Sequence, residues 1–192
     1  MWQRRQILLM LLSLVSVPAA AQPSPSPIDT LMSRLAAVPA SRASFTEEKT
    51  IAALTEPVRS EGWLVYRRPD HLEKTTTGPN RESLMVDGDR LSIIADDQPP
   101  RIIELDSEPS LRGLVDAVRG TLSGDLATLR RSYGVAMQGT PAAWQLTLTP
   151  RDKALKELLR QVTVDGTGTE LRSVRIVQAN GDQSLMTIRP AS

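Results

Sequence analysis

Short candidate β-strands make up most of this chain, and helical periodicity is confined to two segments. Apolar residues recur at three- and four-residue spacing over 28–37 and again over 111–131, where Gly120 and Gly124 interrupt the pattern. Strands and helices do not alternate, so the order of elements predicts an antiparallel sheet rather than a parallel one. The candidate strands are 45–54, 62–68, 72–76, 83–86, 90–95, 101–105, 143–149, 159–164, 171–178 and 184–189.

Turn dipeptides connect several of these strands. Asp87-Gly88, Asp165-Gly166 and Asn180-Gly181 are residue pairs that accept the positive φ angles of tight hairpins. About ten short strands in one sheet curl strongly or close into a barrel. The sequence therefore predicts a mainly β fold with helices (α+β), in which a curved antiparallel sheet has helices over one face.

The first residues are typical of an export signal. Arg4 and Arg5 precede an apolar stretch over 7–17, and Ala19-Ala20-Ala21 gives an A-x-A cleavage signature. An uncleaved membrane anchor is the alternative, but a bilayer core needs roughly 20 apolar residues. We predict a signal peptide over 1–21, a flexible Pro/Ser spacer over 22–27, a single domain over 28–192, and a periplasmic location.

Composition excludes several classes of function. The chain has no cysteine and one histidine, His71, so disulfides, zinc-thiolate sites and His-based triads have little to be built from. Loss of Arg4 and Arg5 leaves basic and acidic residues almost balanced, which argues against nucleic acid as a partner. We expect no enzyme activity, no metal, no cofactor and a monomer, with His71 in a solvated loop.

Alternation along the strands assigns their faces. Trp144, Leu146 and Leu148 share one face of their strand while polar residues occupy the other. Val174 and Ile176 fall on one face of a later strand, together with Arg172. Helices must cover such an apolar face, and two interpretations fit the pattern: a densely packed core, or a lid over an apolar cavity.

Charged residues on the early strands are mostly expected on a solvated face. Glu47-Glu48-Lys49 and Arg67 fit that expectation. Arg68 differs, because alternation places it on the face of Leu64 and Tyr66. A guanidinium beside apolar residues needs an acceptor, and carbonyl groups at helix ends would serve.

The ordered features resemble the outer-membrane lipoprotein carrier protein (LolA) family. The resemblance rests on RLAAVPASRASFTEEKT at 34–50, EGWLVYRRPDHLEK at 61–74, ESLMVDGDRLSII at 82–94 and LTLTPRD at 146–152. The family form is a helix, a strand with S-F-x-Q, a strand ending in R-P, and a hairpin around a D-G turn. The resemblance covers most of the chain.

This resemblance implies an incomplete β-barrel whose helical lid closes over an apolar, acyl-binding cavity. It implies a carrier that takes acylated lipoproteins from an inner-membrane donor complex to an outer-membrane acceptor. Arg68 is similar to the family's lid latch, the residue that holds the empty form shut, and Leu72 falls near the cavity mouth. On the apolar strand faces, the candidates for the cavity lining are Leu64, Tyr66, Leu84, Val86, Leu91, Ile93, Trp144, Leu146 and Leu148.

The chain departs from the family pattern at three places. Glu47 replaces the usual glutamine, Leu72 replaces an aromatic residue, and the C-terminus after Arg189 is shortened. Similar carriers move other acyl compounds, so the cargo stays open between lipoproteins and other lipids, including glycolipids and polyketide-derived lipids. A periplasmic interaction or sensor domain that binds no lipid is the third alternative.

Overall fold

The computed structural model describes residues 25–96 and 98–191. The predicted signal peptide (1–21) and residues 22–24 of the predicted spacer lie outside this range. Two peptide bonds before proline, Arg68-Pro69 and Gly78-Pro79, are cis.

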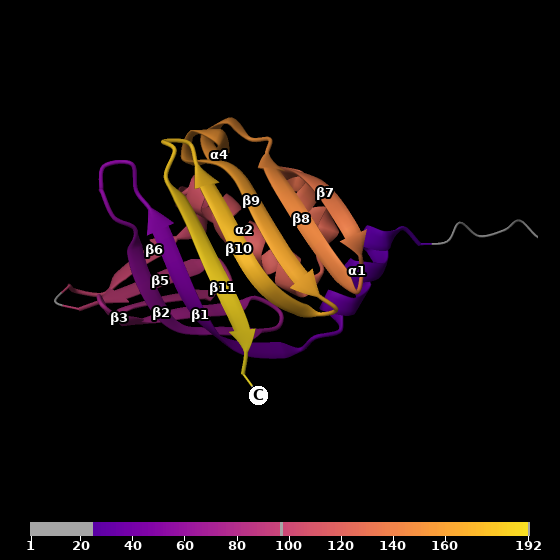
Figure 1. Ribbon diagram of the computed structural model, residues 1–192, viewed down its shortest axis with the longest axis horizontal. Coiled ribbons are helices and arrows are strands. Elements are labelled where there is room, and N and C mark those ends of the chain that lie inside the picture. The colour runs from indigo at the N-terminus through magenta and orange to yellow at the C-terminus, as the bar shows by residue number, and fades with distance from the viewer. Residues whose placement is uncertain (1–24, 97, 192) are drawn as a thin grey trace, which may run out of the picture.

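One open, curved antiparallel sheet organises the described part of the chain (Figure 1). Its eleven strands run in the order β6-β5-β4-β3-β2-β1-β11-β10-β9-β8-β7, so β6 and β7 form the two edges. The strands are β1 (Ala40–Thr50), β2 (Val58–Arg67), β3 (His71–Gly78), β4 (Glu82–Asp87), β5 (Arg90–Ala95), β6 (Arg101–Glu104), β7 (Tyr133–Thr140), β8 (Ala143–Pro150), β9 (Leu159–Thr167), β10 (Glu170–Gln178) and β11 (Gln183–Pro190).

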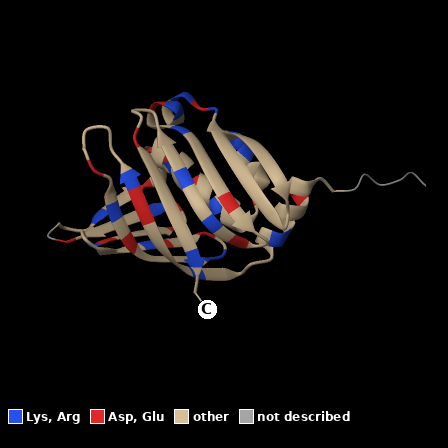
Figure 2. Cartoon of the chain, viewed as in Figure 1, with Lys and Arg blue, Asp and Glu red and all other residues tan. Residues whose placement is uncertain are grey.

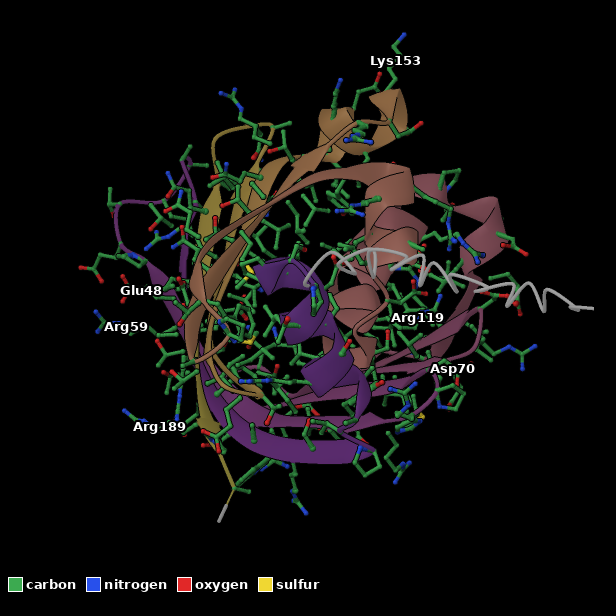
Figure 3. The ribbon with its side chains drawn as sticks, turned by 90° about the vertical axis from the view of Figure 1, so that its right-hand side faces the viewer. Glu48, Arg59, Asp70, Arg119, Lys153 and Arg189 are labelled. Carbon is green, nitrogen blue, oxygen red and sulfur yellow. The ribbon has the colours of Figure 1, made fainter. Side chains whose placement is uncertain are left out.

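The helices lie inside the curve of the sheet (Figure 3). They are α1 (Pro27–Ala36), α2 (Pro109–Ser123), α3 (Leu126–Ser132) and α4 (Lys153–Leu158), with a short 3₁₀ turn η1 (Leu105–Ser107) before α2. The predicted α+β class, with a curved antiparallel sheet under helices, is therefore confirmed.

Local sequence explains where α1 begins and which face it buries. Ser26 is its N-cap, and the Ser26 hydroxyl accepts a hydrogen bond from the Asp29 backbone N–H. Leu31, Met32 and Leu35 form its buried stripe, as the helical spacing predicts. The helix ends just before Val38-Pro39, because the residue before proline disfavours the α conformation.

Helix α2 packs through two different sides. Its most buried side is made of small residues, and a Cβ added at Gly120 would lie 2.9 Å from the Leu129 side chain of α3. Gly120 is thus a close-packing residue inside α2, and the predicted interruption there is wrong. The helix stops at Gly124, whose φ of +68° is the left-handed conformation of a C-terminal cap.

Two clusters of buried apolar side chains hold the helices on the sheet. The second cluster is the smaller: Val86, Leu91 and Leu105 are its buried members, at the β3–β6 end. The first cluster joins β7–β10 to all four helices, and its buried members are Leu31, Met32, Leu35, Ala117, Leu129, Tyr133, Trp144, Leu146, Leu148, Leu155, Leu159, Val162 and Val164. The core is therefore divided, with α2 contributing to both parts.

Three sequence predictions about the second half of the chain need correction. Strand β7 and helix α4 were not predicted, because β7 carries two glycines and α4 has fewer than two turns. Asp165-Gly166 is not a turn: both residues lie inside β9, and the chain reverses at Gly168-Thr169. Arg172 occupies a register shift in β10, so it does not share the inward face of Val174 and Ile176.

Every helix within 25–96 and 98–191 is too short or too polar to cross a bilayer.

Candidate functional site

A central strip of the concave face belongs to neither buried cluster. It lies on β1, β2 and β11, between the two halves of the core, and we define it as Phe45, Leu64, Tyr66, Met186 and Ile188. Leu64 and Met186 are only partly buried, although both share a face with buried neighbours. Val118 and Leu122 of α2 are also partly buried and outside both clusters.

The nine predicted lining residues all come from inward-facing strand positions, but the structure separates them into three groups. Leu64 and Tyr66 lie in the central strip. Four contribute to the second cluster and three are buried in the first cluster; these groups are Leu84, Val86, Leu91 and Ile93, and Trp144, Leu146 and Leu148. Leu72, the predicted mouth residue, is partly buried against the second cluster, beside Tyr66. Their roles in binding a ligand stay predictions.

Arg68 connects the sheet to the ends of two helices. Its Nη1 donates to the Ala36 carbonyl at the end of α1 and, at 3.4 Å, to the Ser123 carbonyl at the end of α2. Carbonyls in the last helical turn lack partners within the helix and carry the negative end of the helix dipole. The sequence predicts helix-end carbonyls as acceptors for Arg68, and the structure contains these hydrogen bonds.

Gly124 allows the two helix ends to meet where Arg68 reaches them. A Cβ at position 124 would lie 2.1 Å from the Met32 carbonyl oxygen and 2.8 Å from the Ala36 backbone nitrogen. No residue other than glycine fits this space. The sequence marks Gly124 as an interruption of the helical pattern, but its contact with α1 is visible only in three dimensions.

Replacing Arg68 with leucine tests this contact. We expect the ends of α1 and α2 to exchange amide hydrogens about fivefold faster, because a partly solvated charge-assisted hydrogen bond contributes about 1 kcal/mol. Hydrogen exchange followed by mass spectrometry measures the exchange rates of these helix ends. Arg67→Leu is the matched control, because Arg67 contacts His71 on the other face. Equal amide exchange rates at these helix ends in both variants would show that Arg68 does not hold the helices in place.

A second connection, which sequence reasoning missed, joins α2 to the β4–β5 turn. Arg119 donates from Nη1 to the Gly88 carbonyl at 2.8 Å and from Nη2 to the buried Asp116 carboxylate at 2.8 Å. Arg112, two helical turns earlier in α2, lies 3.1 Å from Asp89 in the same β4–β5 turn. Figure 3 shows Arg119 on the helix side of the molecule, while Glu48, Arg59 and Arg189 project outward from the sheet.

An ion pair between a buried carboxylate and a partly buried lysine lies on the concave face beside the central strip. The Lys74 ammonium lies 2.6 Å from Glu47 Oε2 and 5.0 Å from the centroid of the Phe45 ring. Glu47 is 5% exposed, so the prediction that Glu47 lies on a solvated face is wrong. The pair spans β2, which lies between β1 and β3; at Gly62 of β2 an added Cβ would lie 1.8 Å from the Thr75 carbonyl oxygen and 3.0 Å from Cε1 of Phe45.

His71 is not in a solvated loop, contrary to the sequence prediction. It begins β3, and its Nδ1 lies 2.6 Å from Asp87 Oδ1 while Nε2 lies 2.9 Å from Arg67 Nη2. Arginine can only donate, so Nε2 accepts and Nδ1 carries the hydrogen. His71 therefore joins β3 to β4.

Two hollows border the sheet in the described part of the chain. One, of about 600 Å³, borders β1, β2 and β11 and is lined by polar and charged residues including Glu47, Glu48 and Arg59. The other, of about 520 Å³, lies near Asn80 and Arg101 at the hairpin ends.

Charged residues of both signs lie along the strands. Lysine and arginine are interspersed with aspartate and glutamate in the view of Figure 2. No group of three or more His, Asp or Glu side chains among residues 25–96 and 98–191 is arranged to hold a metal ion.

Comparison with protein families gives a match over nearly the whole chain. The family described as outer membrane lipoprotein carrier protein LolA-like matches residues 20–191. No curated protein matches this sequence.

The solved structures that match this chain include three of low sequence identity. A LolA superfamily protein from Nitrosomonas europaea is 8% identical, with 88% of this chain and 95% of that chain covered and a TM-score of 0.44. The MucA/MucB complex of Pseudomonas aeruginosa is 14% identical, with 85% and 56% covered and a TM-score of 0.43. A DUF1329 family protein from Desulfovibrio piger is 9% identical, with 84% and 88% covered and a TM-score of 0.36.

Proposed function

Because the chain belongs to the outer membrane lipoprotein carrier protein LolA-like family, we propose that it is a periplasmic carrier that binds acyl chains between α2 and the central strip. The cargo is an acylated lipoprotein or another acyl lipid, received from an inner-membrane donor and passed to an outer-membrane acceptor. The chain acts by binding and release, without a catalytic step.

The observation that carries this proposal is the divided core. The two clusters are separate although α2 contributes to both, and the strip between them keeps Leu64 and Met186 partly exposed on an inward face. A soluble domain that needed only stability would bury such residues in one continuous core. Burial of each methylene of an acyl chain against this strip would contribute about 0.8 kcal/mol.

Loading requires the lid to move. The contacts of Arg68 with α1 and α2, and those of Arg119 with the β4–β5 turn, hold α2 over the strip from two sides. Breaking them is a cost of binding that lowers the apparent affinity for cargo. A lowered affinity favours a carrier, because cargo that is bound too tightly cannot be passed on.

Native mass spectrometry of the gently purified protein tests the proposal most directly. We expect co-purified acyl compounds, whose masses identify the cargo as lipopeptide or another lipid. A protein that carries none, and that fails to bind a dansyl-labelled fatty acid in solution, would instead favour the non-lipid interaction or sensor alternative.

The matched pair Leu64→Gln and Val65→Gln locates the binding surface. These neighbours on β2 are both partly buried but face opposite sides of the sheet. We expect Leu64→Gln to weaken binding of the dansyl fatty acid roughly 10-fold, because an amide replaces apolar contact area. Val65→Gln should leave it unchanged. Fluorescence titration measures both affinities, and equal losses would place the acyl chain elsewhere.

A further inference from the structure

The Tyr66 hydroxyl is the one buried side-chain polar atom in 25–96 and 98–191 that lacks a hydrogen-bond partner. Tyr66 is 2% exposed and lies in the central strip, on the face of β2 that points toward the helices. A buried hydroxyl without a partner destabilises the folded state, because it has lost its hydrogen bonds to water without replacing them. Buried polar groups in folded proteins are nearly always paired, so an unpaired one calls for an explanation.

Tyr66 is close in the chain to the residue that contacts the helix ends. Arg68 follows two residues later, and its guanidinium is bonded to the carbonyls that end α1 and α2. Leu72, the predicted mouth residue, is the cross-strand neighbour of Tyr66. Tyr66 therefore belongs to the central strip and is the cross-strand neighbour of the predicted mouth residue.

The chemistry of the hydroxyl favours a donor. Burial raises the pKa of Tyr66, and the positive charge of Arg68 only partly opposes that effect. The phenol keeps its proton throughout the physiological pH range and offers an O–H to an acceptor. Opening of the lid would also leave Arg68 without its helix-end acceptors, so two donors would face the same space.

An acyl cargo carries the matching acceptor. Its hydrocarbon chain has no polar atoms, but an ester or amide carbonyl joins that chain to the rest of the molecule. We propose that the Tyr66 hydroxyl is the polar anchor of the acyl site, donating to the ester or amide carbonyl of the bound cargo. This inference rests on the proposed function and adds the position of the carbonyl. The hydrocarbon then extends along the central strip.

A ligand pair that differs only in carbonyl groups tests the anchor. The first ligand is a synthetic diacylglyceryl lipopeptide with ester-linked palmitoyl chains, and the second is the same peptide with ether-linked chains. Wild-type protein should prefer the ester ligand by about 3- to 10-fold, the effect of one hydrogen bond. In Tyr66→Phe, which loses only the hydroxyl, that preference should disappear while ether-ligand affinity stays unchanged.

Each result bears on a different proposal. If wild type and Tyr66→Phe prefer the ester ligand to the same extent, the hydroxyl does not bind the carbonyl. That result overturns the anchor but not the carrier function. If neither ligand binds the wild-type protein, lipid carriage itself is overturned, and the anchor with it.

The empty protein provides an independent measurement. Tyr66→Phe should unfold at the same denaturant concentration as wild type or a higher one, because the variant removes a polar atom that has no partner. A clear loss of stability would show that the hydroxyl is already satisfied in the empty form, for example by an internal water molecule. That result would also overturn the anchor.

Discussion

Replacing Gly166 with alanine is expected to destabilise the protein by about 3 kcal/mol. A Cβ at this position would lie 2.1 Å from Cζ2 of the Trp144 indole, which is directly opposite on β8. Trp144 is 4% exposed, and its Nε1 donates to the Gly168 carbonyl at 2.9 Å. The added methyl group must displace the ring, so both the hydrogen bond and the packing in the first cluster are lost.

Urea unfolding followed by circular dichroism measures this loss as a shift of the midpoint. Gly134→Ala in β7 is the matched control, because the nearest non-neighbouring atoms lie 3.7 Å from its added Cβ, an ordinary contact distance. We expect that variant to stay within about 0.5 kcal/mol of wild type. In a Trp144→Leu background the effect of Gly166→Ala should shrink; full additivity would contradict the proposed clash.

Replacing Lys74 with methionine should cost about 3 kcal/mol, because it leaves the Glu47 carboxylate buried without its close partner. The ammonium of Lys74 is 2.6 Å from that carboxylate, whereas Lys49, the remaining cation, is 3.8 Å away and about half exposed. Methionine has a side chain of similar length to lysine and packs favourably against aromatic rings, so we expect it to replace the contact of Lys74 with Phe45. The loss would therefore come from the unpaired charge rather than from poor packing.

The reverse variant, Glu47→Gln, should cost less, about 1 kcal/mol. Lys74 is 21% exposed and its long side chain can turn its ammonium toward water. The double variant Glu47→Gln/Lys74→Met should recover most of the stability lost in Lys74→Met alone. Denaturant unfolding of the four proteins gives the coupling energy. A loss in Glu47→Gln as large as in Lys74→Met would contradict this asymmetry.

Most of the sheet could be predicted because strands and turns leave patterns among residues that are neighbours in the sequence. Alternating apolar residues and Gly-containing turns gave ten of the strands, and helical spacing gave α1 and the α2–α3 region. The edge strand β7 was missed because Gly134 and Gly139 interrupt a pattern with few apolar residues. Helix α4 was missed because it is short; its signal was Asp152, whose side chain caps the Ala154 and Leu155 N–H groups.

Predictions failed where a residue's role depends on a distant neighbour. Asp165-Gly166 has the composition of a turn, but Gly166 is required by the Trp144 ring on the adjacent strand. Glu47 has the sequence context of a surface charge, but Lys74 arrives from β3 to pair with it. Neither partner can be identified from spacing along the chain.

The sequence by itself determined the strand-rich class, the antiparallel order, the faces of most strands and the inward direction of Arg68, because these depend on alternation between neighbouring residues. The tertiary structure decided how that inward face is used. It divided the apolar residues between two clusters, brought the ends of α1 and α2 to Arg68, and left the Tyr66 hydroxyl unpaired. Those outcomes depend on how far the sheet curves and where α2 crosses it, which is set by packing between residues far apart in the chain.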